Sequence, residues 1–555
     1  MKLVRSWVLP AVAGWLLVAQ PVVAAEGISG NLVTAKWLEQ NLNRSEVVLL
    51  DASSPQVYAA KHIPGAISVD FLIYGFPERT LADMEARYQS WGISPGKKIV
   101  MYDQGGTFLA TRLMFSLYYH GFPVQDLLVL DGGLAKWEAL GLPITKDVPP
   151  APGKGSFKIV KLRKDARVAV PEVLTATGDP ANNVLLEALG PDWHFGQVAP
   201  FNREGHIPNS TLLPADDFFN ADKTFKSAEE IRRMVTYVGI RPEQQIHSYC
   251  GGGVAASVPY FALKFILNFP KVALFPESEV GWLSDPRDLP YWTYDAPFLL
   301  RDTRWMQSWG GQMMRMYGVS KVSVVDVRPG ESFGQGHIPF ALNVPGDVFR
   351  RHVGSPEKLA PILGPAGVDA TQEAVIVSGG GLTRDAALAF VMLEKLGQKK
   401  VSIFVDSADE WNRVGFKLTK DATIIGPRKG PMDLSIQPTI YPGSLRPDVM
   451  IADPTTTKGV YPKVFIASGT SEPDKTPAGT VVHVPYSDLL NADGTPKPAK
   501  EIWKILAKAG VPRYAELVCF CDDPGEAAVN FFLLKLMGYP DVKVWADAAP
   551  ARSTF

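Results

Sequence analysis

The chain has 555 residues, of which 46% are apolar and 20% are charged, and its formal net charge is −1. This length exceeds what one hydrophobic core usually supports, so we expect three to five folded domains. The composition is that of an ordinary folded protein. A net charge so close to zero gives no reason to expect a nucleic acid or an anionic membrane surface as a partner.

The first 25 residues, 1–25, have the pattern of a secretory signal peptide. Lys2 and Arg5 precede an apolar run over residues 7–19, and small residues that suit cleavage follow it up to Ala25. A retained N-terminal anchor is the alternative, which Pro10 within the run disfavours. No later segment approaches the roughly 20 apolar residues that span a bilayer. We therefore expect a periplasmic protein with no integral membrane segment in the mature chain.

A signal centred on His-Ile-Pro occurs three times, as "KHIPGAISVD" at 61–70, "GHIPNSTLLP" at 205–214 and "GHIPFALNVP" at 336–345. Each copy is followed by a β-like apolar run, a glycine-rich turn and a helical stretch. A fourth copy lacks the signal, but its residues 484–511 match residues 213–240. The spacing relates the first copy to the third and the second to the fourth. The repeat therefore predicts four modules in two duplicated pairs.

Each copy alternates short runs rich in Val, Ile and Leu with amphipathic helical stretches, such as "SAEEIRRMVTYVGI" at 227–240. This alternation is typical of a parallel sheet with helices on both faces, so the predicted fold class is α/β. Proline-rich segments at 148–153 and 426–446 separate parts of the chain. We expect the four modules to occupy residues 28–147, 165–297, 303–420 and 437–550.

The chain has three cysteines, Cys250, Cys519 and Cys521. Exported proteins usually form disulfides, but an odd number of cysteines leaves at least one thiol free. Cys519 and Cys521 would lie on one face of a strand, near the upper limit of Cα separation for a bridge, so a disulfide between them would be strained. A free thiol in an exported protein is a candidate reactive group.

Together these features resemble the rhodanese sulfurtransferase family. The resemblance rests on the His-Ile-Pro signal, on "LDGGLAKW" at 130–137, on "NADKTFKSAEEI" at 220–231 and on a cysteine where a strand runs into a loop. "LVTAKWLEQNL" at 32–42 also resembles the start of tandem thiosulfate and mercaptopyruvate sulfurtransferases. Membership implies rhodanese-like modules, each built around a five-stranded parallel sheet. It also implies that the second module of a pair performs the chemistry, because the first has lost its cysteine.

The position equivalent to the family's nucleophile differs among the four copies. It holds Asp103 in the first module, Cys250 in the second, Ser378 in the third and Cys521 in the fourth. Neither aspartate nor serine can hold a persulfide, so we expect the first and third modules to be structural partners. The resemblance therefore places the reactive thiol at Cys250, with Cys521 as a second site in a degenerate module.

Cys250 begins the segment "CGGGVAAS", which suits persulfide chemistry. A thiolate that accepts and then releases sulfur needs stabilisation, because a free thiol has a pKa of about 8.5. Small residues let backbone N–H groups turn toward the sulfur, and a helix starting near Ala255 would add its positive end. The alternative is a buried, inert cysteine that ends a strand. The predicted substrate-binding residues are Gly251, Gly252, Gly253, Val254 and Ala255.

The loop departs from the family pattern in ways that concern the sulfur donor. Gly252 and Ala255 stand where the mercaptopyruvate type has Ser and Thr. Glu187 and Leu189 stand where the family has an Asp and an anion-binding Arg. Thiosulfate-type loops carry basic side chains, and this loop has none. We therefore expect poor use of thiosulfate or mercaptopyruvate, and a neutral, polysulfidic or protein-bound donor instead.

The third and fourth modules carry weaker signals. Arg328 and Arg384 of the third module are positioned either to bind an oxyanion beside its glycine loop or to form salt bridges. In the fourth module Asp522 and Asp523 follow Cys521, and we expect them to raise its thiol pKa. This module is therefore expected to be weakly active or inactive. Cys519 is either a resolving thiol or a strand residue.

The sequence thus predicts an exported sulfurtransferase that works through a persulfide on Cys250. Sulfane sulfur would pass from a small donor of the polysulfide, thiosulfate or 3-mercaptopyruvate class to a thiol, cyanide or protein acceptor. No metal ion or organic cofactor is expected. Two alternatives stay open. One is a non-catalytic rhodanese-like protein that binds a sulfur compound or a protein partner, and the other is a thiol redox role for Cys519 and Cys521.

Overall fold

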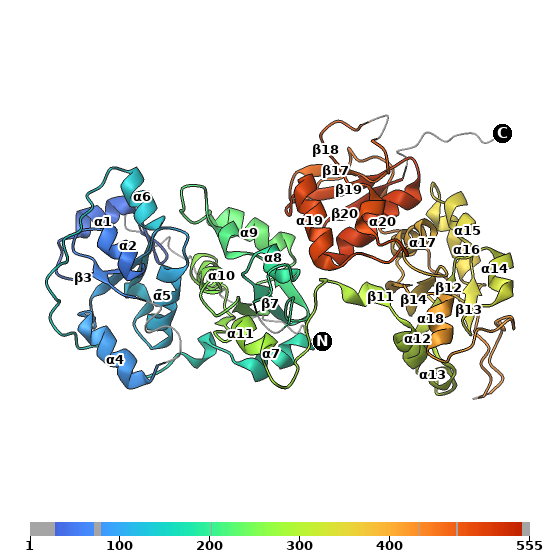
Figure 1. Ribbon diagram of the computed structural model, residues 1–555, viewed down its shortest axis with the longest axis horizontal. Coiled ribbons are helices and arrows are strands. Elements are labelled where there is room, and N and C mark those ends of the chain that lie inside the picture. Colours follow the sequence, from blue (N-terminus) through green and yellow to red (C-terminus); the bar gives the residue numbers. More distant parts are fainter. Residues whose placement is uncertain (1–27, 71–78, 201–202, 431, 473–475, 547–555) are drawn as a thin grey trace, which may run out of the picture.

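The computed structural model describes residues 28–70, 79–200, 203–430, 432–472 and 476–546. It contains four separate sheets, each formed by a different part of the chain (Figure 1). The predicted α/β class is confirmed, because the strands of each sheet alternate along the chain with helices. The predicted signal peptide lies outside the described residues. Within them, no helix has both the length and the apolar character needed to cross a membrane.

The first sheet has the strand order β1-β2-β6-β5-β3-β4 and is parallel except for the pairing of β1 with β2. Its strands are β1 (Ile28–Ser29), β2 (Leu32–Val33), β3 (Val47–Asp51), β4 (Ile67–Ser68), β5 (Lys98–Tyr102) and β6 (Leu127–Leu130). The second sheet is parallel, with the order β10-β9-β7-β8. Its strands are β7 (Asn183–Glu187), β8 (Ser210–Leu212), β9 (Gln245–Tyr249) and β10 (Val272–Leu274).

The second sheet thus has four strands, where the family resemblance implied five. Beyond its edge strand β10, the chain makes only a single bridge, between Arg167 and Leu274. A longer strand cannot form there because helix α7 (Val170–Thr177) begins almost immediately, with Pro171 in its first turn.

The third and fourth sheets are parallel, with the orders β11-β15-β14-β12-β13 and β16-β20-β19-β17-β18. The third contains β11 (Leu300–Arg301), β12 (Val322–Asp326), β13 (Ala341–Asn343), β14 (Glu373–Val377) and β15 (Lys400–Phe404). The fourth contains β16 (Met450–Ile451), β17 (Lys463–Ala467), β18 (Thr480–His483), β19 (Glu516–Phe520) and β20 (Val542–Trp545). The third sheet begins before the expected boundary at residue 303, because Leu300 and Arg301 pair with β15.

Helices connect the strands and cover the sheets. In the first half of the chain they are α1 (Ala35–Asn41), α2 (Pro55–Ala60), α4 (Leu81–Ser90), α5 (Leu109–Tyr119), α6 (Gly133–Ala139), α7, α8 (Pro191–His194), α9 (Ala228–Tyr237), α10 (Ser257–Phe261) and α11 (Ser278–Leu283). In the second half they are α12 (Thr303–Gly310), α13 (Gln312–Met316), α14 (Gly330–Gln335), α15 (Gly346–Arg351), α16 (Ala360–Leu363), α17 (Arg384–Lys395), α18 (Ala408–Arg413), α19 (Ala499–Ala509) and α20 (Pro524–Leu536).

Two hydrophobic cores join the four sheets in pairs. One core contains residues of the first and second sheets, with Phe115 of α5 packed edge-to-face on Tyr260 of α10 at a centroid distance of 5.0 Å. The other contains residues of the third and fourth, with Phe390 of α17 packed in the same way on Phe532 of α20, also at 5.0 Å. Figure 1 shows α17 beside α20. In each pair, the helices that follow the loops at the nucleophile position therefore pack on each other: α5 on α10, and α17 on α20.

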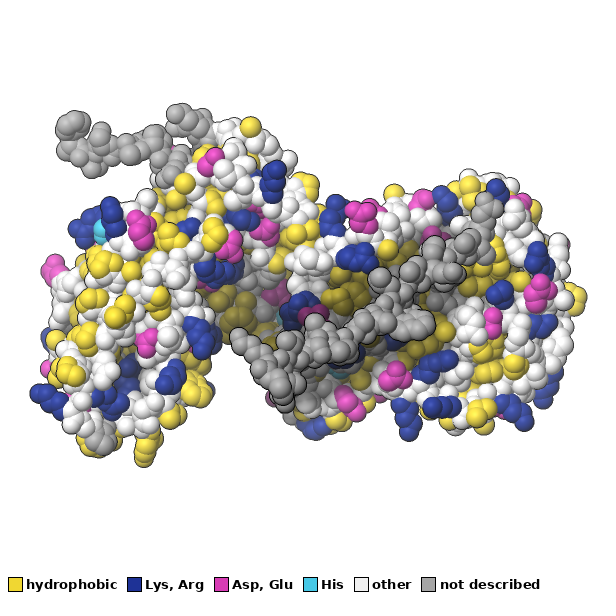
Figure 2. Space-filling model, turned by 180° about the vertical axis from the view of Figure 1, so that it is seen from behind, with side chains coloured by type: hydrophobic (Ala, Val, Ile, Leu, Met, Phe, Trp, Pro, Cys, Tyr) yellow, Lys and Arg dark blue, Asp and Glu magenta, His cyan; other side chains and the backbone are white. Residues whose placement is uncertain are grey.

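The two pairs meet where the second sheet faces the fourth. The hydroxyl of Tyr237, at the end of α9, donates to the carbonyls of Arg513 and Ala515 at 3.2 and 2.9 Å. The Arg513 guanidinium in turn pairs with Asp217 at 2.8 Å. On the surface drawn in Figure 2, cationic and anionic side chains are interspersed, which agrees with the net charge of −1.

Candidate active site

Cys250 lies directly after β9, at the carboxyl end of the second sheet, and its side chain is only 2% exposed. The Gly253 N–H points at Sγ, with 3.1 Å between nitrogen and sulfur. The Cys250 N–H donates to Ser278 Oγ at 3.1 Å, and that hydroxyl donates to the Phe275 carbonyl at 2.7 Å. Ser278 has a φ of 49°, an uncommon conformation for serine. Sequence reasoning missed this residue, which anchors the start of the loop from another segment.

The loop conformation requires glycine at position 253 but not at position 252. Gly253 has a φ of +78°, and a Cβ there would lie 2.7 Å from the Pro276 carbonyl oxygen. At Gly252 a Cβ would meet no atom within 4 Å. The following helix begins at Ser257 rather than near Ala255, and it continues as a π-helical turn over Ala262–Ile266. Pro259 lies in its first turn, where a missing N–H costs little.

The equivalent loop of the first sheet directs its backbone N–H groups at a carboxylate. Asp103 stands at the position of Cys250, and its carboxylate accepts N–H bonds from Gly105 at 2.8 Å and from Leu109 and Ala110 at 3.0 Å. Backbone N–H groups of such a loop therefore surround a negative charge. In the third sheet the equivalent Ser378 is neutral and donates to the Gly381 carbonyl at 3.0 Å.

A cavity lined by arginines lies on Pro276, the residue next to Gly253. Arg79, Arg112 and Arg167 line a cavity of about 100 Å³ together with Pro276. Pro276 is the residue that packs on Gly253. The sequence could not indicate this group, because Arg79 and Arg112 belong to the first module and Arg167 to the start of the second.

A cluster of charged side chains is buried on the second sheet, at the end of β7. His194 bonds Glu187 through Nδ1 and Asp295 through Nε2, each at 2.7 Å. Burial alone would lower the pKa of His194, but the carboxylates of Asp295 and Glu187 raise it to about 9. Burial would likewise raise the pKa of Glu187, yet the His194 cation holds it below its ordinary value. His194 therefore supplies beside Glu187 the positive charge that Arg328 supplies beside the equivalent Asp326 in the third sheet.

Two further buried groups complete this cluster. Burial, together with the neighbouring Glu187 carboxylate, raises the pKa of Glu279 well above its ordinary value. Burial also lowers the pKa of His206 to about 4, and its ring is therefore neutral. Single ligand atoms of Glu187, His194 and His206 lie within 4.8 Å of one another, which makes these residues the candidates for holding a metal ion in the described part of the chain.

The arginines of the third sheet are engaged by carboxylates. Arg328 forms a fork with Asp326, with its Nη2 at 2.6 Å from Oδ2 and its Nε at 3.0 Å from Oδ1. Arg384 reaches the fourth module, where Nη1 lies 2.9 Å from Asp523 and 3.3 Å from Glu526. Arg328 and Arg384 thus form salt bridges, which was the alternative to an oxyanion site. An oxyanion would have to displace these carboxylates.

Cys521 is half-buried, and its Sγ donates to Glu526 Oε2 at 3.1 Å. Burial, followed by this bond to Glu526, raises the pKa of the Cys521 thiol to about 12. The thiol pKa of Cys521 is thus raised, as expected, but mainly by burial and Glu526 rather than by Asp522 and Asp523. The Asp523 carboxylate pairs with Arg384 and Arg350. Cys519 lies fully buried in β19, and burial raises its thiol pKa as well. All three cysteines are free thiols.

Parts of this chain are similar to known proteins. The Rhodanese-like domain family matches residues 34–140 and 311–413. A "Putative thiosulfate sulfurtransferase" of Saccharopolyspora erythraea is 30% identical over 44% of this chain and 91% of its own length. A "Probable 3-mercaptopyruvate sulfurtransferase" of Pseudomonas aeruginosa is 28% identical over 47% of this chain and 97% of its own length. A 3-mercaptopyruvate sulfotransferase structure from Escherichia coli is 26% identical over 45% of this chain and 99% of its own, with a TM-score of 0.41.

Proposed function

The chain belongs to the rhodanese family of sulfurtransferases, and we propose that it transfers sulfane sulfur through a persulfide on Cys250. The observation that carries this proposal is the Gly253 N–H directed at Cys250 Sγ, in a loop whose counterpart in the first sheet surrounds the Asp103 carboxylate with three N–H groups. The same arrangement stabilises a thiolate or a persulfide anion.

The reaction has two displacement steps. The Cys250 thiolate attacks the sulfane sulfur of the donor, so that an Sγ–S bond forms while the donor's own bond to that sulfur breaks. The remainder of the donor leaves with the electron pair of the broken bond. A thiolate or cyanide acceptor then attacks the outer sulfur of the persulfide and regenerates the Cys250 thiolate. Neither step changes the number of electrons, so no separate oxidant or reductant is needed.

The donor that fits best is a small anion, such as polysulfide or thiosulfate. The Cys250 loop has no basic side chain, and on that ground the sequence favoured a neutral, polysulfidic or protein-bound donor. The cavity beside Pro276, however, is lined by Arg79, Arg112 and Arg167. Guanidinium groups favour anions through charge-assisted hydrogen bonds. The relatives named for thiosulfate and 3-mercaptopyruvate support a donor of the same general class.

The two pairs of modules have different roles in this proposal. The pair with Cys250 performs the transfer. The Cys521 thiol is held protonated by burial and by Glu526, so the second pair has a structural or binding role. The family match covers the first and third modules, and their packing on the second and fourth supports two rhodanese-like pairs. The N-terminal sequence supports export to the periplasm, with cleavage after Ala25.

The test is mass spectrometry of the mature protein after incubation with polysulfide or with thiosulfate, followed by cyanide. We expect one added sulfur on the Cys250 peptide, removed by cyanide and absent in Cys250→Ser. The Cys521→Ser variant is the matched control and should load sulfur normally. An accessible Cys250 that takes up no sulfur from either donor would instead favour the non-catalytic binding role. A reversible Cys519–Cys521 disulfide would favour the redox role.

A further inference from the structure

The third module contains a polar cavity that the sulfur-transfer steps do not use. Its volume is about 360 Å³, and its lining comes from the segment before β12, from the loop before β14 and from residues 434–439. Lys321 and Gln372 directly precede the two strands. Ser378, at the position equivalent to the nucleophile, follows the opposite end of β14. The cavity is therefore separate from the end of the sheet where rhodanese-like modules carry their reactive group.

One wall of this cavity is an addition to the repeat. Helices α1 and α12 are equivalent, because the N-caps Thr34 and Asp302 both accept the N–H of a tryptophan, Trp37 and Trp305. In the first module β3 starts 13 positions after the cap, whereas in the third β12 starts 20 positions after it. The extra residues form α13, which lies next to α12 in Figure 1. This added helix supplies Arg315 to the cavity.

Arg315 is a mostly buried cation without a carboxylate partner. Its Nε donates to the Gly310 carbonyl at 2.9 Å and its Nη2 to the Val322 carbonyl at 3.1 Å, and the guanidinium lies 4.8 Å from the centre of the Phe340 ring. Within the described residues, Nη1 makes no hydrogen bond and no carboxylate pairs with the guanidinium. Burial lowers the pKa of Arg315 to about 10, and no anion offsets this effect. A buried charge of this kind is stabilised by a counterion.

Further hydrogen-bond donors line the same cavity. The exposed Lys321 forms no ion pair with any residue of the described ranges. The hydroxyl oxygen of Ser320 is buried and has no hydrogen-bond partner among those residues. Arg428 adds a third cation, and its Nε donates to the Asp433 carbonyl at 2.7 Å. Three cationic side chains and a hydroxyl without a partner thus surround one space.

The carboxylate of Asp369 also lines the cavity, but its oxygens are already bonded. Oδ1 accepts the Thr371 N–H at 2.8 Å and the Thr371 hydroxyl at 2.7 Å, and Oδ2 accepts the Gln372 amide at 3.0 Å. The charge at the start of the strand is reversed between the modules, because Glu46 precedes β3 where Lys321 precedes β12. The third-module cavity therefore keeps an excess of positive charge.

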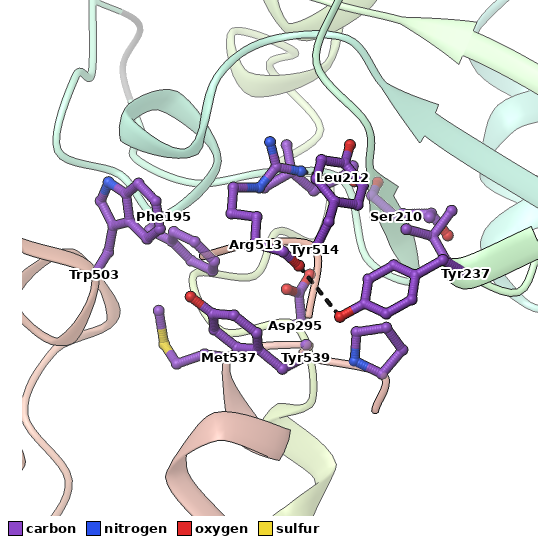
Figure 3. A pocket seen from close by; sticks show the side chains of 14 residues that line it. Phe195, Ser210, Leu212, Tyr237, Asp295, Trp503, Arg513, Tyr514, Met537 and Tyr539 are labelled. Atoms are coloured by element: carbon purple, nitrogen blue, oxygen red, sulfur yellow. Dashed lines mark hydrogen bonds between the residues drawn. The ribbon is translucent and has the colours of Figure 1, made fainter. Parts of the chain in front are cut away.

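The cavity between the second and fourth sheets differs in this respect. It has a volume of about 200 Å³, and Figure 3 shows that aromatic side chains such as Tyr237 and Trp503 line it. The one cation among its described lining residues, Arg513, pairs with Asp217 at 2.8 Å. Its cation thus has a counterion, whereas the cavity beside Arg315 lacks one.

We propose that the cavity beside Arg315 binds a small organic molecule through a phosphate or sulfate group. Guanidinium and ammonium groups recognise such tetrahedral oxyanions through charge-assisted hydrogen bonds. A water molecule needs only about 10–15 Å³ of cavity volume, so 360 Å³ leaves room for an organic part beyond the oxyanion. Leu434 and Ile436 also line the cavity and offer apolar contacts to that part. No cysteine-bearing loop takes part, so the proposal is independent of sulfur transfer.

The test is hydrogen–deuterium exchange of the full chain in inorganic phosphate and, separately, in inorganic sulfate. Each is compared with chloride at the same ionic strength, so that general screening cancels. We expect slower amide exchange in peptides that cover residues 314–323 and 434–439. The oxyanion concentration that gives half the effect should rise about tenfold in Arg315→Gln and about threefold in Lys321→Gln. The matched control is Arg44→Gln, which removes an exposed arginine before β3 and should behave as the wild type.

Peptide resolution separates this site from the arginine-lined cavity beside Pro276. Protection of the two peptides by phosphate, by sulfate or by both supports the proposal and identifies the preferred oxyanion. The proposal is overturned if neither oxyanion slows exchange there relative to chloride, or if protection is confined to the peptides of the other cavity. It is also overturned if both variants fold and keep the wild-type half-effect concentration. If Arg315→Gln does not fold, the comparison of Lys321→Gln with the wild type decides.

Discussion

Gly253 is the residue whose replacement tests the geometry of the Cys250 loop most directly. Its φ is +78°, and an added Cβ would lie 2.7 Å from the Pro276 carbonyl oxygen and 2.8 Å from Pro276 Cα. The left-handed conformation costs an alanine roughly 1–2 kcal/mol. Overpacking against backbone atoms costs about 1–3 kcal/mol. In Gly253→Ala, the native loop conformation is therefore expected to be about 2–5 kcal/mol less favourable.

This cost translates into the rate of sulfur loading. A difference of 1.4 kcal/mol is a factor of ten, so the ratio of molecules with the Gly253 N–H on Cys250 Sγ to those without it falls about thirtyfold or more. We expect the initial rate of sulfur addition from polysulfide, followed by intact-mass spectrometry, to fall by up to the same factor. Far-UV circular dichroism checks that the rest of the protein remains folded.

The neighbouring glycine provides the matched control. Gly252 does not have a positive φ, and a Cβ there meets no atom within 4 Å, so Gly252→Ala should load sulfur within about twofold of the wild-type rate. The reasoning is refuted if Gly253→Ala loads as fast as the wild type while keeping its fold. It is equally refuted if the two variants are impaired to the same extent.

Three further predictions concern other parts of the molecule. Because its thiol pKa is about 12, native Cys521 should react with iodoacetamide at pH 8 roughly a thousandfold more slowly than Cys521 of the urea-unfolded protein. The Glu526→Gln variant should bring the two rates closer together. Equal rates in the native and unfolded protein would contradict the raised pKa of this thiol. The raised pKa of His194 contributes stability that is complete below pH 6.5 and is lost as the pH rises through about 9. Since each pKa unit is worth about 1.4 kcal/mol, urea unfolding at pH 6 and pH 9.5 should differ by roughly 3 kcal/mol, and a pH-independent midpoint would argue against the buried cation. Finally, Tyr237→Phe removes the hydroxyl oxygen that accepts the Ala515 N–H at 3.3 Å, so amide exchange at Ala515 should accelerate. Unchanged protection would show that the contacts of this hydroxyl, which also donates to the Arg513 and Ala515 carbonyls, do not hold the two pairs together.

Much of the fold was predictable because its signals are local. Alternating apolar runs and amphipathic stretches predicted parallel sheets with helices, and helix α9 begins where Ser227 and Glu230 form a capping box. Repeat spacing predicted the position of Cys250 directly after a strand, and β9 ends at Tyr249. The expected fifth strand of the second sheet was wrong, because its formation depended on how soon helix α7 begins. The helix after Cys250 begins at Ser257, two residues after the expected start near Ala255.

The electrostatic surroundings of each thiol came only from the tertiary structure. The arginines of the cavity beside Pro276 and the Asp295 carboxylate on His194 reach their sites by the packing of distant segments. The Glu526 carboxylate on Cys521 is closer in sequence, but its bond to the thiol depends on how the loop turns into helix α20. His194 and Asp295, for example, are far apart in sequence and lie 2.7 Å apart in space. The sequence by itself therefore predicted Cys250 as the candidate nucleophile, since this cysteine and its glycine loop are contiguous. Which charges act on that residue depends on contacts between distant segments, and these are decided only when the sheets and helices pack.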